Sequence, residues 1–356
     1  MTSHNSINSN KLNLLDRRSI LISTIGGLIG TSSICLQSNA QTIKPQLQVG
    51  LIRNPVAGLI DVSARKGWFK EAGVDFKSIL FAGAAGPKIL QAMGGGSIGL
   101  SSVSSTAALF ALSAEAIPMK IVSIATDPVP LFNILSSAGI KDIKDLAGKK
   151  VSAPQGTGLQ YFLARALEKY GMSLKDIEYL NLPAGDAQSA FLAGRIDAIV
   201  PSIIGGLLIQ KIKPDTKILF SPADFTKGPG SLKPMINYDV FVGSDSILNT
   251  QKDLISSFLS VYHERAVPYV KDKSTSSDAI KEINDYVNFE QKTPTDVSII
   301  RELLVRSGFY DRTQTRKIIS SDEFIASMED QVKFFMDTGQ MARAVAIRSN
   351  VIKGLI

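Results

Sequence analysis

Two kinds of hydrophobic pattern alternate between residues 46 and 211. Short apolar runs are separated by segments whose apolar residues recur at every third or fourth position. This alternation is typical of parallel β-sheets with helices on both faces. The clearest helices are predicted over 159–170, ended by Gly171, and over 187–193, capped by Asp186. The predicted strands are 47–52, 74–80, 98–101, 119–125, 150–153, 177–180 and 198–200.

The pattern changes after residue 211. A loop rich in Gly and Pro at 227–234 leads into one more predicted strand, 238–243. Beyond it, helical spacing predicts helices over 253–270, 276–289, 295–306 and 322–336. Ser320 and Glu323 are predicted to form a capping box for the last helix. The chain therefore reads as an α/β protein of two lobes with a helical carboxyl-terminal segment, as its 356 residues allow.

Composition excludes several classes of function. The 39 basic and 32 acidic side chains form no run of five like charges, so we expect no nucleic-acid partner. Cys35 and His4 lie in the first 40 residues, which leaves the rest of the chain with His263 and no thiol. Disulfides, Cys/His metal sites and thiol nucleophiles are thereby excluded, and we expect neither metal nor cofactor. His263 lies in a predicted helix and is expected to have a surface or packing role.

Residues 1–40 have the order of an export signal. A polar start ends in Arg17 and Arg18, an uncharged stretch covers 19–34, and a small-x-small site ends at Ala40. The uncharged stretch is too short and too weakly apolar for a stable membrane span. We predict cleavage after Ala40. The twin-arginine and general secretory routes, an uncleaved anchor and a lipid on Cys35 remain open alternatives.

The strongest local motif covers residues 151–158. A predicted strand ends in a turn, Gln155-Gly156-Thr157, that opens directly into a helix. Such a turn aims backbone N–H groups and the positive end of the helix at whatever lies over it, so it could bind an anion. The phosphate-loop and dinucleotide glycine patterns are both absent. The alternative is that the glycines only shape the turn and Thr157 only caps its helix.

Two other turns follow strands in the same way. One contains Gly83, and the other contains Ser102 and Ser104. Because the carboxyl ends of parallel strands meet at one edge of a sheet, the three turns should line one polar pocket. Arg53, just past the first strand, could bind an oxyanion there, or it could be a solvated surface arginine. An apolar part of the ligand is expected against Leu159, Ile199 and Val200.

Catalytic groups are not recognisable in the sequence. Asp186 and Asp197 are interpreted as a helix cap and a turn residue rather than as a general acid and base. Trp68 is expected to pack in the core. We therefore expect a binding protein and no enzyme.

Four motifs together resemble a known family. They are Ala64-Arg65-Lys66-Gly67-Trp68-Phe69 with Ala72-Gly73-Val74, the segment 143–151, Gly156-Thr157-Gly158, and Ala193-Gly194-Arg195-Ile196-Asp197-Ala198. The chain resembles the substrate-binding proteins of ABC importers for nitrate, taurine and aliphatic sulfonates, a family that includes binders of thiamine-pyrimidine precursors. The sequence departs from many relatives at Ile199-Val200-Pro201, where an aromatic residue is common. The resemblance therefore does not fix the ligand.

The resemblance implies a type II periplasmic binding protein fold. Residues 41–127 and 242–356 would form lobe 1, residues 128–241 would form lobe 2, and the chain would cross between them at 127–131 and 237–243. The ligand would lie in the cleft. The ligand-binding residues are then expected to be Arg53, Gly83, Ser102, Ser104, Asp127, Gln155, Gly156, Thr157 and Pro201.

The function that this resemblance implies is periplasmic solute binding for an ABC importer. The expected ligand is a small oxyanion-bearing solute such as an organic sulfonate, and the expected partner is a membrane permease. The protein itself is expected to be a monomer. Nitrate or bicarbonate binding, pyrimidine-precursor binding and an exported enzyme on the same fold are the alternatives.

Overall fold

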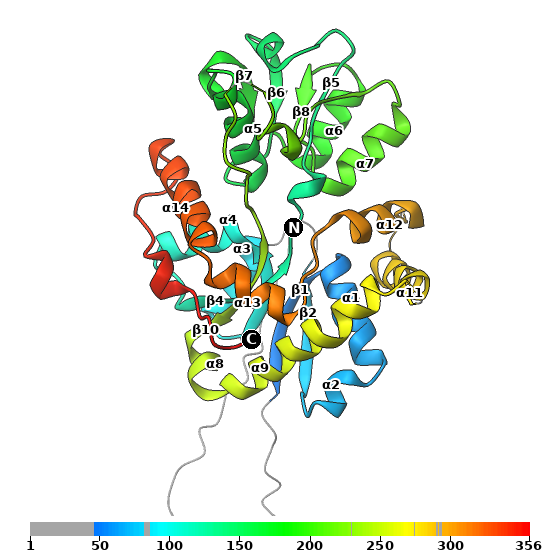
Figure 1. Cartoon of the computed structure of the whole chain (residues 1–356), viewed down its shortest axis with the longest axis vertical. Helices are drawn as coiled ribbons and strands as arrows, with labels where there is room; N and C mark the ends of the chain where they lie inside the picture. Colours follow the sequence, from blue (N-terminus) through cyan, green and yellow to red (C-terminus); the bar gives the residue numbers. More distant parts are fainter. Residues whose placement is uncertain (1–45, 82–85, 229, 274, 290, 292–293) are drawn as a thin grey trace, which may run out of the picture. The chain divides into compact units, whose positions relative to one another are not determined.

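The computed structural model describes residues 46–81, 86–228, 230–273, 275–289, 291 and 294–356. Within them the chain forms two five-stranded sheets, each flanked by helices (Figure 1). The first sheet takes four strands that precede the second sheet in the sequence and one strand, β10, that follows it, so the second sheet is formed wholly by the segment between β4 and β10. This is the α/β architecture predicted from the hydrophobic pattern.

The first sheet has the strand order β2-β1-β3-β10-β4. β1 is parallel to both of its neighbours, whereas β10 runs antiparallel between β3 and β4. All but β2 are largely buried, as expected for apolar strands in the middle of a layered protein. The strands are β1 (Leu47–Ile52), β2 (Phe76–Phe81), β3 (Leu100–Ser104), β4 (Met119–Thr126) and β10 (Asp239–Ser244).

The second sheet has the order β7-β6-β8-β5-β9. β5 runs antiparallel to both β8 and β9, and the other pairs are parallel. β5 and β9 were not predicted, because a run as short as Ile134-Leu135-Ser136 carries too little periodicity to be recognised. The strands are β5 (Ile134–Ser136), β6 (Lys150–Ser152), β7 (Glu178–Leu180), β8 (Ala198–Ile199) and β9 (Lys217–Phe220).

Helices cover both sheets. The second sheet has α5 (Gly158–Lys169), α6 (Ala184–Leu192) and α7 (Ile203–Ile212). The first sheet has α1 (Pro55–Arg65), α2 (Trp68–Glu71), α3 (Gly86–Gly94) and α4 (Ser105–Ser113), followed after β10 by α8 (Asp245–Thr250), α9 (Lys252–Val261), α10 (Val267–Lys271), α11 (Ser276–Asn288), α12 (Val297–Arg306), α13 (Arg312–Ser320) and α14 (Asp322–Asp337). A π-helical turn, Tyr262–Ala266, joins α9 to α10.

Short 3-10 turns complete the described chain, at Val129–Leu131, Ile143–Leu146, Leu174–Asp176, Pro222–Asp224 and Ile347–Asn350. The first of them follows β4 at the predicted first crossing. The second crossing ends in β10. The predicted lobe boundary between residues 241 and 242 falls inside this strand, which belongs wholly to the first sheet. Hydrogen bonding along the whole of β10 explains why the strand is not divided.

Two predicted helix caps are wrong in detail. α6 begins after Pro183, so Asp186 lies in its first turn and is not its cap. α14 is capped by Ser321, whose hydroxyl oxygen accepts from the backbone N–H of Phe324, rather than by Ser320 with Glu323. Because Ser320 still belongs to α13, the cap falls one residue later than the sequence pattern indicated.

His263 and Trp68 both pack inside or against the first lobe. His263 is fully buried, with Nε2 2.7 Å from Ser123 Oγ and Nδ1 2.9 Å from the Tyr310 carbonyl oxygen. Burial lowers the pKa of His263 to about 4, so the ring is neutral at neutral pH. The ring of Trp68 is only half-buried and meets the Tyr269 ring edge to face. Trp68 therefore covers the edge of the core instead of filling its centre.

A buried hydrogen-bond triad joins the second crossing to two helices. Asn237 Nδ2 donates to Thr106 Oγ1 on α4 at 2.9 Å and to Gln331 Oε1 on α14 at 3.0 Å. Thr106 Oγ1 donates to the same Gln331 oxygen at 2.9 Å. All three side chains are buried, and Gly158 at the start of α5 lies directly against Asn237. This Asn237–Thr106–Gln331 triad fixes the crossing segment just before β10.

The contact between Gly158 and Asn237 gives a stability prediction. A Cβ on Gly158 would lie 2.5 Å from Asn237 Nδ2, closer than atoms can pack. Gly158→Ala should lower the free energy of unfolding by about 1–3 kcal/mol, because the triad must shift. Denaturant unfolding followed by circular dichroism measures this. Gly185→Ala is the matched control, since nothing lies within 4 Å of its added Cβ. Equal stability of the two variants would contradict the prediction.

Candidate functional site

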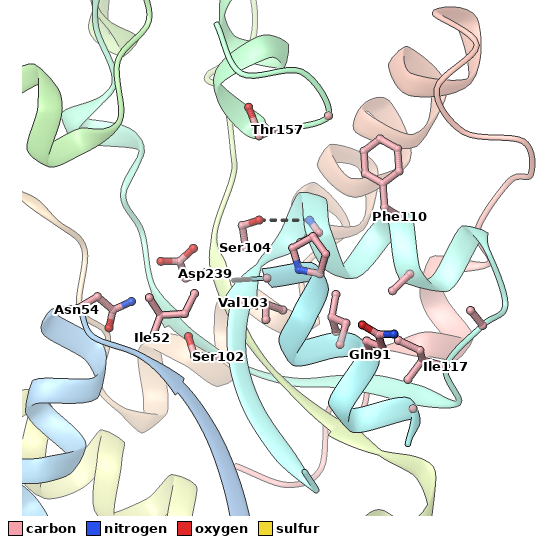
Figure 2. Close-up of a pocket in the computed structure, with 18 of the residues that line it drawn as sticks. Ile52, Asn54, Gln91, Ser102, Val103, Ser104, Phe110, Ile117, Thr157 and Asp239 are labelled. Atoms are coloured by element: carbon pink, nitrogen blue, oxygen red, sulfur yellow. Dashed lines mark hydrogen bonds between the residues drawn. The ribbon is translucent and has the colours of Figure 1, made fainter. Parts of the chain in front are cut away.

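We call the first sheet with its helices the first lobe, and the second sheet with its helices the second lobe. A cavity of about 880 Å³ is lined by residues of both lobes (Figure 2). This volume can hold a drug-sized organic molecule. Asn54, Ser102 and Ser104 line it from the first lobe, and Gln155 to Thr157 line it from the second. The remaining lining residues are Ile52, Gly86, Pro87, Leu90, Gln91, Gly94, Val103, Ala107, Phe110, Ala111, Ala116, Ile117 and Asp239.

The polar lining residues lie where strands end and helices begin. Asn54 caps α1, Ser104 caps α4 and Thr157 caps α5, each accepting from a backbone N–H of its own first turn. Because all three caps line the cavity, the N-termini of three helices converge on it. A helix N-terminus carries a positive partial charge. The sequence predicted this gathering for Ser102, Ser104, Gln155, Gly156 and Thr157, and these residues do line the cavity. Gly83 lies outside the described residues.

Three donors of the 154–158 turn, the Gln155 and Gly156 N–H groups and the Thr157 hydroxyl, are already used within the protein. The backbone N–H of Gly156 donates to Gln160 Oε1 at 2.8 Å, and that of Gln155 donates to Asn181 Oδ1 at 3.0 Å. Thr157 Oγ1 donates to the Pro154 carbonyl oxygen at 2.6 Å. The Gln155 and Gly156 N–H groups, which the sequence interpretation expected to be free for an anion, are therefore occupied in this structure. Gln160 and Asn181 were missed because side chains that fold back onto a turn leave no spacing signal.

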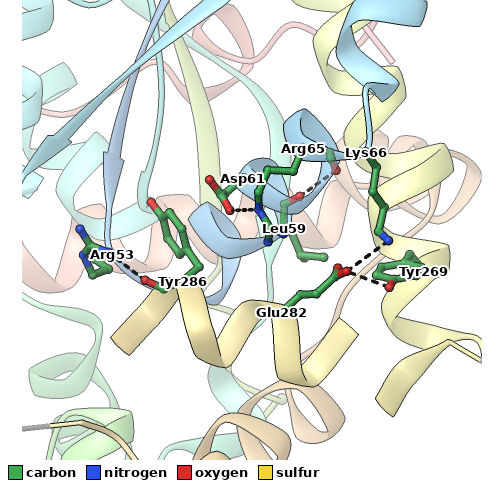
Figure 3. A network of polar contacts seen from close by, with 9 residues as sticks. Arg53, Leu59, Asp61, Arg65, Lys66, Tyr269, Glu282 and Tyr286 are labelled. Atoms are coloured by element: carbon green, nitrogen blue, oxygen red, sulfur yellow. Dashed lines mark hydrogen bonds and ion pairs between the residues drawn. The ribbon is translucent and has the colours of Figure 1, made fainter. Parts of the chain in front are cut away.

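Arg53 does not reach the cavity. Its Nη1 donates to the Tyr286 carbonyl oxygen at 2.8 Å, and its guanidinium lies 5.3 Å from the Tyr286 ring centre and 5.7 Å from that of Phe289 (Figure 3). Arg53 is absent from the cavity lining. The expected oxyanion fork is instead a packing contact between the end of β1 and α11, a partner more than 200 residues away in sequence.

Asp127 and Pro201 are also absent from the cavity lining. Asp127 Oδ1 accepts from the Val129 backbone N–H at 3.0 Å, and Oδ2 accepts from the Tyr310 hydroxyl at 3.0 Å. Burial raises the pKa of Asp127. Pro201 is buried and packs against Gly206 of α7. Both were expected at the ligand, but their contacts give them structural roles at the crossing and at the start of α7.

The apolar wall comes from α3, α4 and the loop that follows α4. Leu90, Ala107, Phe110 and Ile117 line one end of the cavity. The residues predicted to form this wall, Leu159, Ile199 and Val200, do not line the cavity. Ile199 and Val200 are buried within the second lobe. Phe110 also meets the Phe335 ring of α14 at 4.9 Å between ring centres, which holds it in place. The cavity is therefore polar toward the helix N-termini and apolar between α3 and α4.

Asp239 is a cavity residue that sequence reasoning missed. It begins β10 and lines both the main cavity and an adjoining one of about 230 Å³. Of the described residues that line either cavity, it is the only charged one. Burial, and secondly the negative charge of Asp127, raise the pKa of Asp239 to about 6. Its position at the start of a predicted crossing strand was the available signal.

No helix among the described residues is long and apolar enough to cross a membrane. In the same part of the chain, no three His, Cys, Asp or Glu side chains are grouped so that they could hold a metal ion.

The raised pKa of Asp239 predicts a change of stability with pH. An unfolded aspartate has a pKa near 3.9, so the folded protein keeps a proton on Asp239 that the unfolded chain loses between about pH 4 and pH 6. The unfolding free energy should fall over this range as pH rises. Asp239→Asn removes this loss and should gain up to about 3 kcal/mol over wild type between about pH 4 and pH 7. Denaturant unfolding of wild type and Asp239→Asn at several pH values measures this. Unfolding free energies that change with pH in the same way for both proteins would disprove the prediction.

The chain is similar in sequence and in fold to known binding proteins. The chain is 26% identical over 249 residues to a presumed binding protein of Brucella abortus, covering 69% of this chain and 74% of that protein. It is 22% identical over 339 residues to a presumed aliphatic sulfonates-binding protein of Bacillus subtilis, covering 93% of each. The crystal structure of the periplasmic aliphatic sulphonate binding protein of Escherichia coli matches with a TM-score of 0.70 at 20% identity, over 86% of this chain and 92% of that one.

A desulfurization enzyme has the same fold, with a TM-score of 0.61 at 11% identity over 88% of this chain and 97% of that one. These structures confirm the predicted fold of a periplasmic binding protein, which both binding proteins and an enzyme use. Residues 54–273 match the model of the family described as NMT1/THI5 like. Because this match spans more than half of the chain, the protein belongs to the NMT1/THI5-like family.

Proposed function

We propose that the protein is the periplasmic solute-binding component of an ABC importer, and that it binds its solute between the two lobes. The observation that carries the proposal is a cavity whose walls come from both lobes, with Asn54 and Ser104 on one and Thr157 on the other. A solute held there touches both lobes at once, so its binding energy can favour the closed arrangement. Similarity to binding proteins, including one that is named periplasmic, supports the same function.

The solute that fits this cavity is an organic molecule with an oxyanion group. The N-termini of α1, α4 and α5 favour negative charge in the polar half. The apolar half between α3 and α4 would accept a hydrocarbon or aromatic body. An organic sulfonate is our first choice, since two relatives are named for binding sulfonates. Nitrate or bicarbonate would leave most of the cavity empty, and a pyrimidine precursor is the remaining alternative.

An exported enzyme is the alternative from another class, because a desulfurization enzyme has this fold. The described cavity residues offer one titratable side chain, Asp239, whereas acid–base chemistry commonly uses a pair. The Ser123 and His263 side chains do contact each other, but both are fully buried away from the cavity. We therefore propose binding without turnover. Chemical conversion of a bound sulfonate would reject this.

The apolar half of the cavity gives a testable prediction. Ala107→Phe should fill the space between α3 and α4 and weaken the binding of octanesulfonate at least tenfold, about 1.4 kcal/mol. Isothermal titration calorimetry measures the affinity, and a melting curve verifies the fold. Ala114→Phe is the matched control at the exposed end of the same helix and should bind like wild type. Unchanged binding by Ala107→Phe would exclude the α3–α4 half as part of the site.

The location in the periplasm gives a second prediction. We expect the exported protein to begin at Gln41, since the small-x-small site ends at Ala40. Amino-terminal sequencing of the exported form tests this, and retention of Met1 or a lipid on Cys35 would contradict it. Replacing Arg17 and Arg18 by lysine should block export if the twin-arginine route is used, and leave it intact if the general route is used.

A further inference from the structure

The position of Asp239 in the cavity is fixed by its strand. As the first residue of β10, Asp239 pairs with Ser104 of β3 on one side and with Thr126 of β4 on the other. Its carboxylate lines the main cavity near Asn54, Ser102 and Ser104 (Figure 2). Because β10 is paired on both sides, the backbone of Asp239 is held at the cavity by the sheet.

The Asp239 carboxylate has no partner in the described part of the chain. Its burial and the charge of Asp127 raise its pKa, and no hydrogen bond or ion pair of the described residues reaches its side chain. The charged and titratable groups that face it are Asp127, past the end of β4, and Tyr262, from the π-helical turn. Neither is a partner, since Asp127 is negative and the Tyr262 hydroxyl donates to the Ala125 carbonyl oxygen. A half-buried carboxylate without a donor is costly for the folded protein.

The cavity lining offers no positive side chain to balance this charge. Among the described residues that line the main cavity and its neighbour, none is lysine, arginine or histidine. Arg53, the cation that the sequence placed here, is bonded to Tyr286 instead. A solute whose only charged group is an oxyanion would thus meet a carboxylate and no cation. Water can donate to the carboxylate in the open cavity, so a solute that displaces this water must bring a donor of its own to keep the carboxylate hydrogen-bonded.

We infer that the solute carries an N–H donor, best met by a protonated amine, which hydrogen-bonds to Asp239 while the apolar body of the solute lies between α3 and α4. This inference rests on the proposed solute-binding function and makes Asp239 its specificity-determining residue. It distinguishes this site from one that recognises an oxyanion and an alkyl chain alone. A charge-assisted hydrogen bond of this kind accounts for roughly 10- to 150-fold in affinity.

Three probes on one aromatic frame test the inference. They are 4-(aminomethyl)benzenesulfonate, 4-methylbenzenesulfonate, which lacks the amine, and 4-methylbenzylamine, which lacks the sulfonate. Calorimetric affinities are measured for wild type, for Asp239→Asn and for Asp186→Asn, which removes an exposed carboxylate of α6 as the matched control. We expect wild type and Asp186→Asn to bind the aminomethyl sulfonate at least tenfold tighter than the methyl sulfonate. Asp239→Asn should lose this preference and remain folded.

The affinity for amine probes should also rise with pH. Between about pH 5 and pH 7 the Asp239 carboxyl loses its proton in the free protein, so it becomes a better acceptor for a cation. The affinity of Asp239→Asn should stay level over the same range. A wild-type affinity that falls as pH rises would overturn the inference, since it would mean that the protonated carboxyl donates to an anion.

The remaining outcomes separate this inference from the proposed function. Equal or tighter binding of 4-methylbenzenesulfonate by wild type, unchanged in Asp239→Asn, would overturn the role of Asp239 and leave sulfonate binding intact. Binding of 4-methylbenzylamine alone, lost in Asp239→Asn, would support the role of Asp239 and reject the oxyanion part of the proposed function. Failure of all three probes to bind folded wild type would count against both.

Discussion

The buried triad of Asn237, Thr106 and Gln331 is the interaction on which the site depends most. It joins the second crossing to α4 and α14 through three hydrogen bonds among fully enclosed side chains. Such groups stabilise a fold only while each has a partner, because an unsatisfied buried amide costs about 1–3 kcal/mol. The triad therefore holds the crossing in one arrangement. Two residues further along the chain, Asp239 takes its place in the cavity wall.

The antiparallel insertion of β10 extends this constraint to the rest of the site. β10 returns from the second lobe and lies between β3 and β4, so that Asp239 is opposite Ser104. Ser104 is also the cap of α4, whose N-terminus faces the cavity. The same residue pairing thus places a negative side chain beside a positive helix end. A solute in this cavity meets both charges. The chemical groups that it must carry are therefore not set by the helix termini alone.

How much of the site the sequence predicts depends on how local the determining contact is. The polar turns at the ends of β3 and β6 were found because parallel strands bring their carboxyl ends to one edge. Whether a turn's donors are free was not predictable, since Gln160 and Asn181 occupy the Gly156 and Gln155 amides through side-chain geometry. Arg53 was assigned wrongly for a similar reason. Its partners on α11 lie far along the chain, and no spacing rule connects them.

The sequence by itself determined the alternation of strands and helices, the helical carboxyl-terminal segment, most element positions and the family. These follow from hydrophobic period, caps and motifs, which act over a few neighbouring residues. Only the tertiary structure decided that Ile134-Leu135-Ser136 forms a strand, that Arg53 is bonded away from the cavity, and that Asp239 is left inside it without a donor. The physical reason is that pairing and burial are set by contacts between distant segments, and local patterns carry no record of which distant groups will meet.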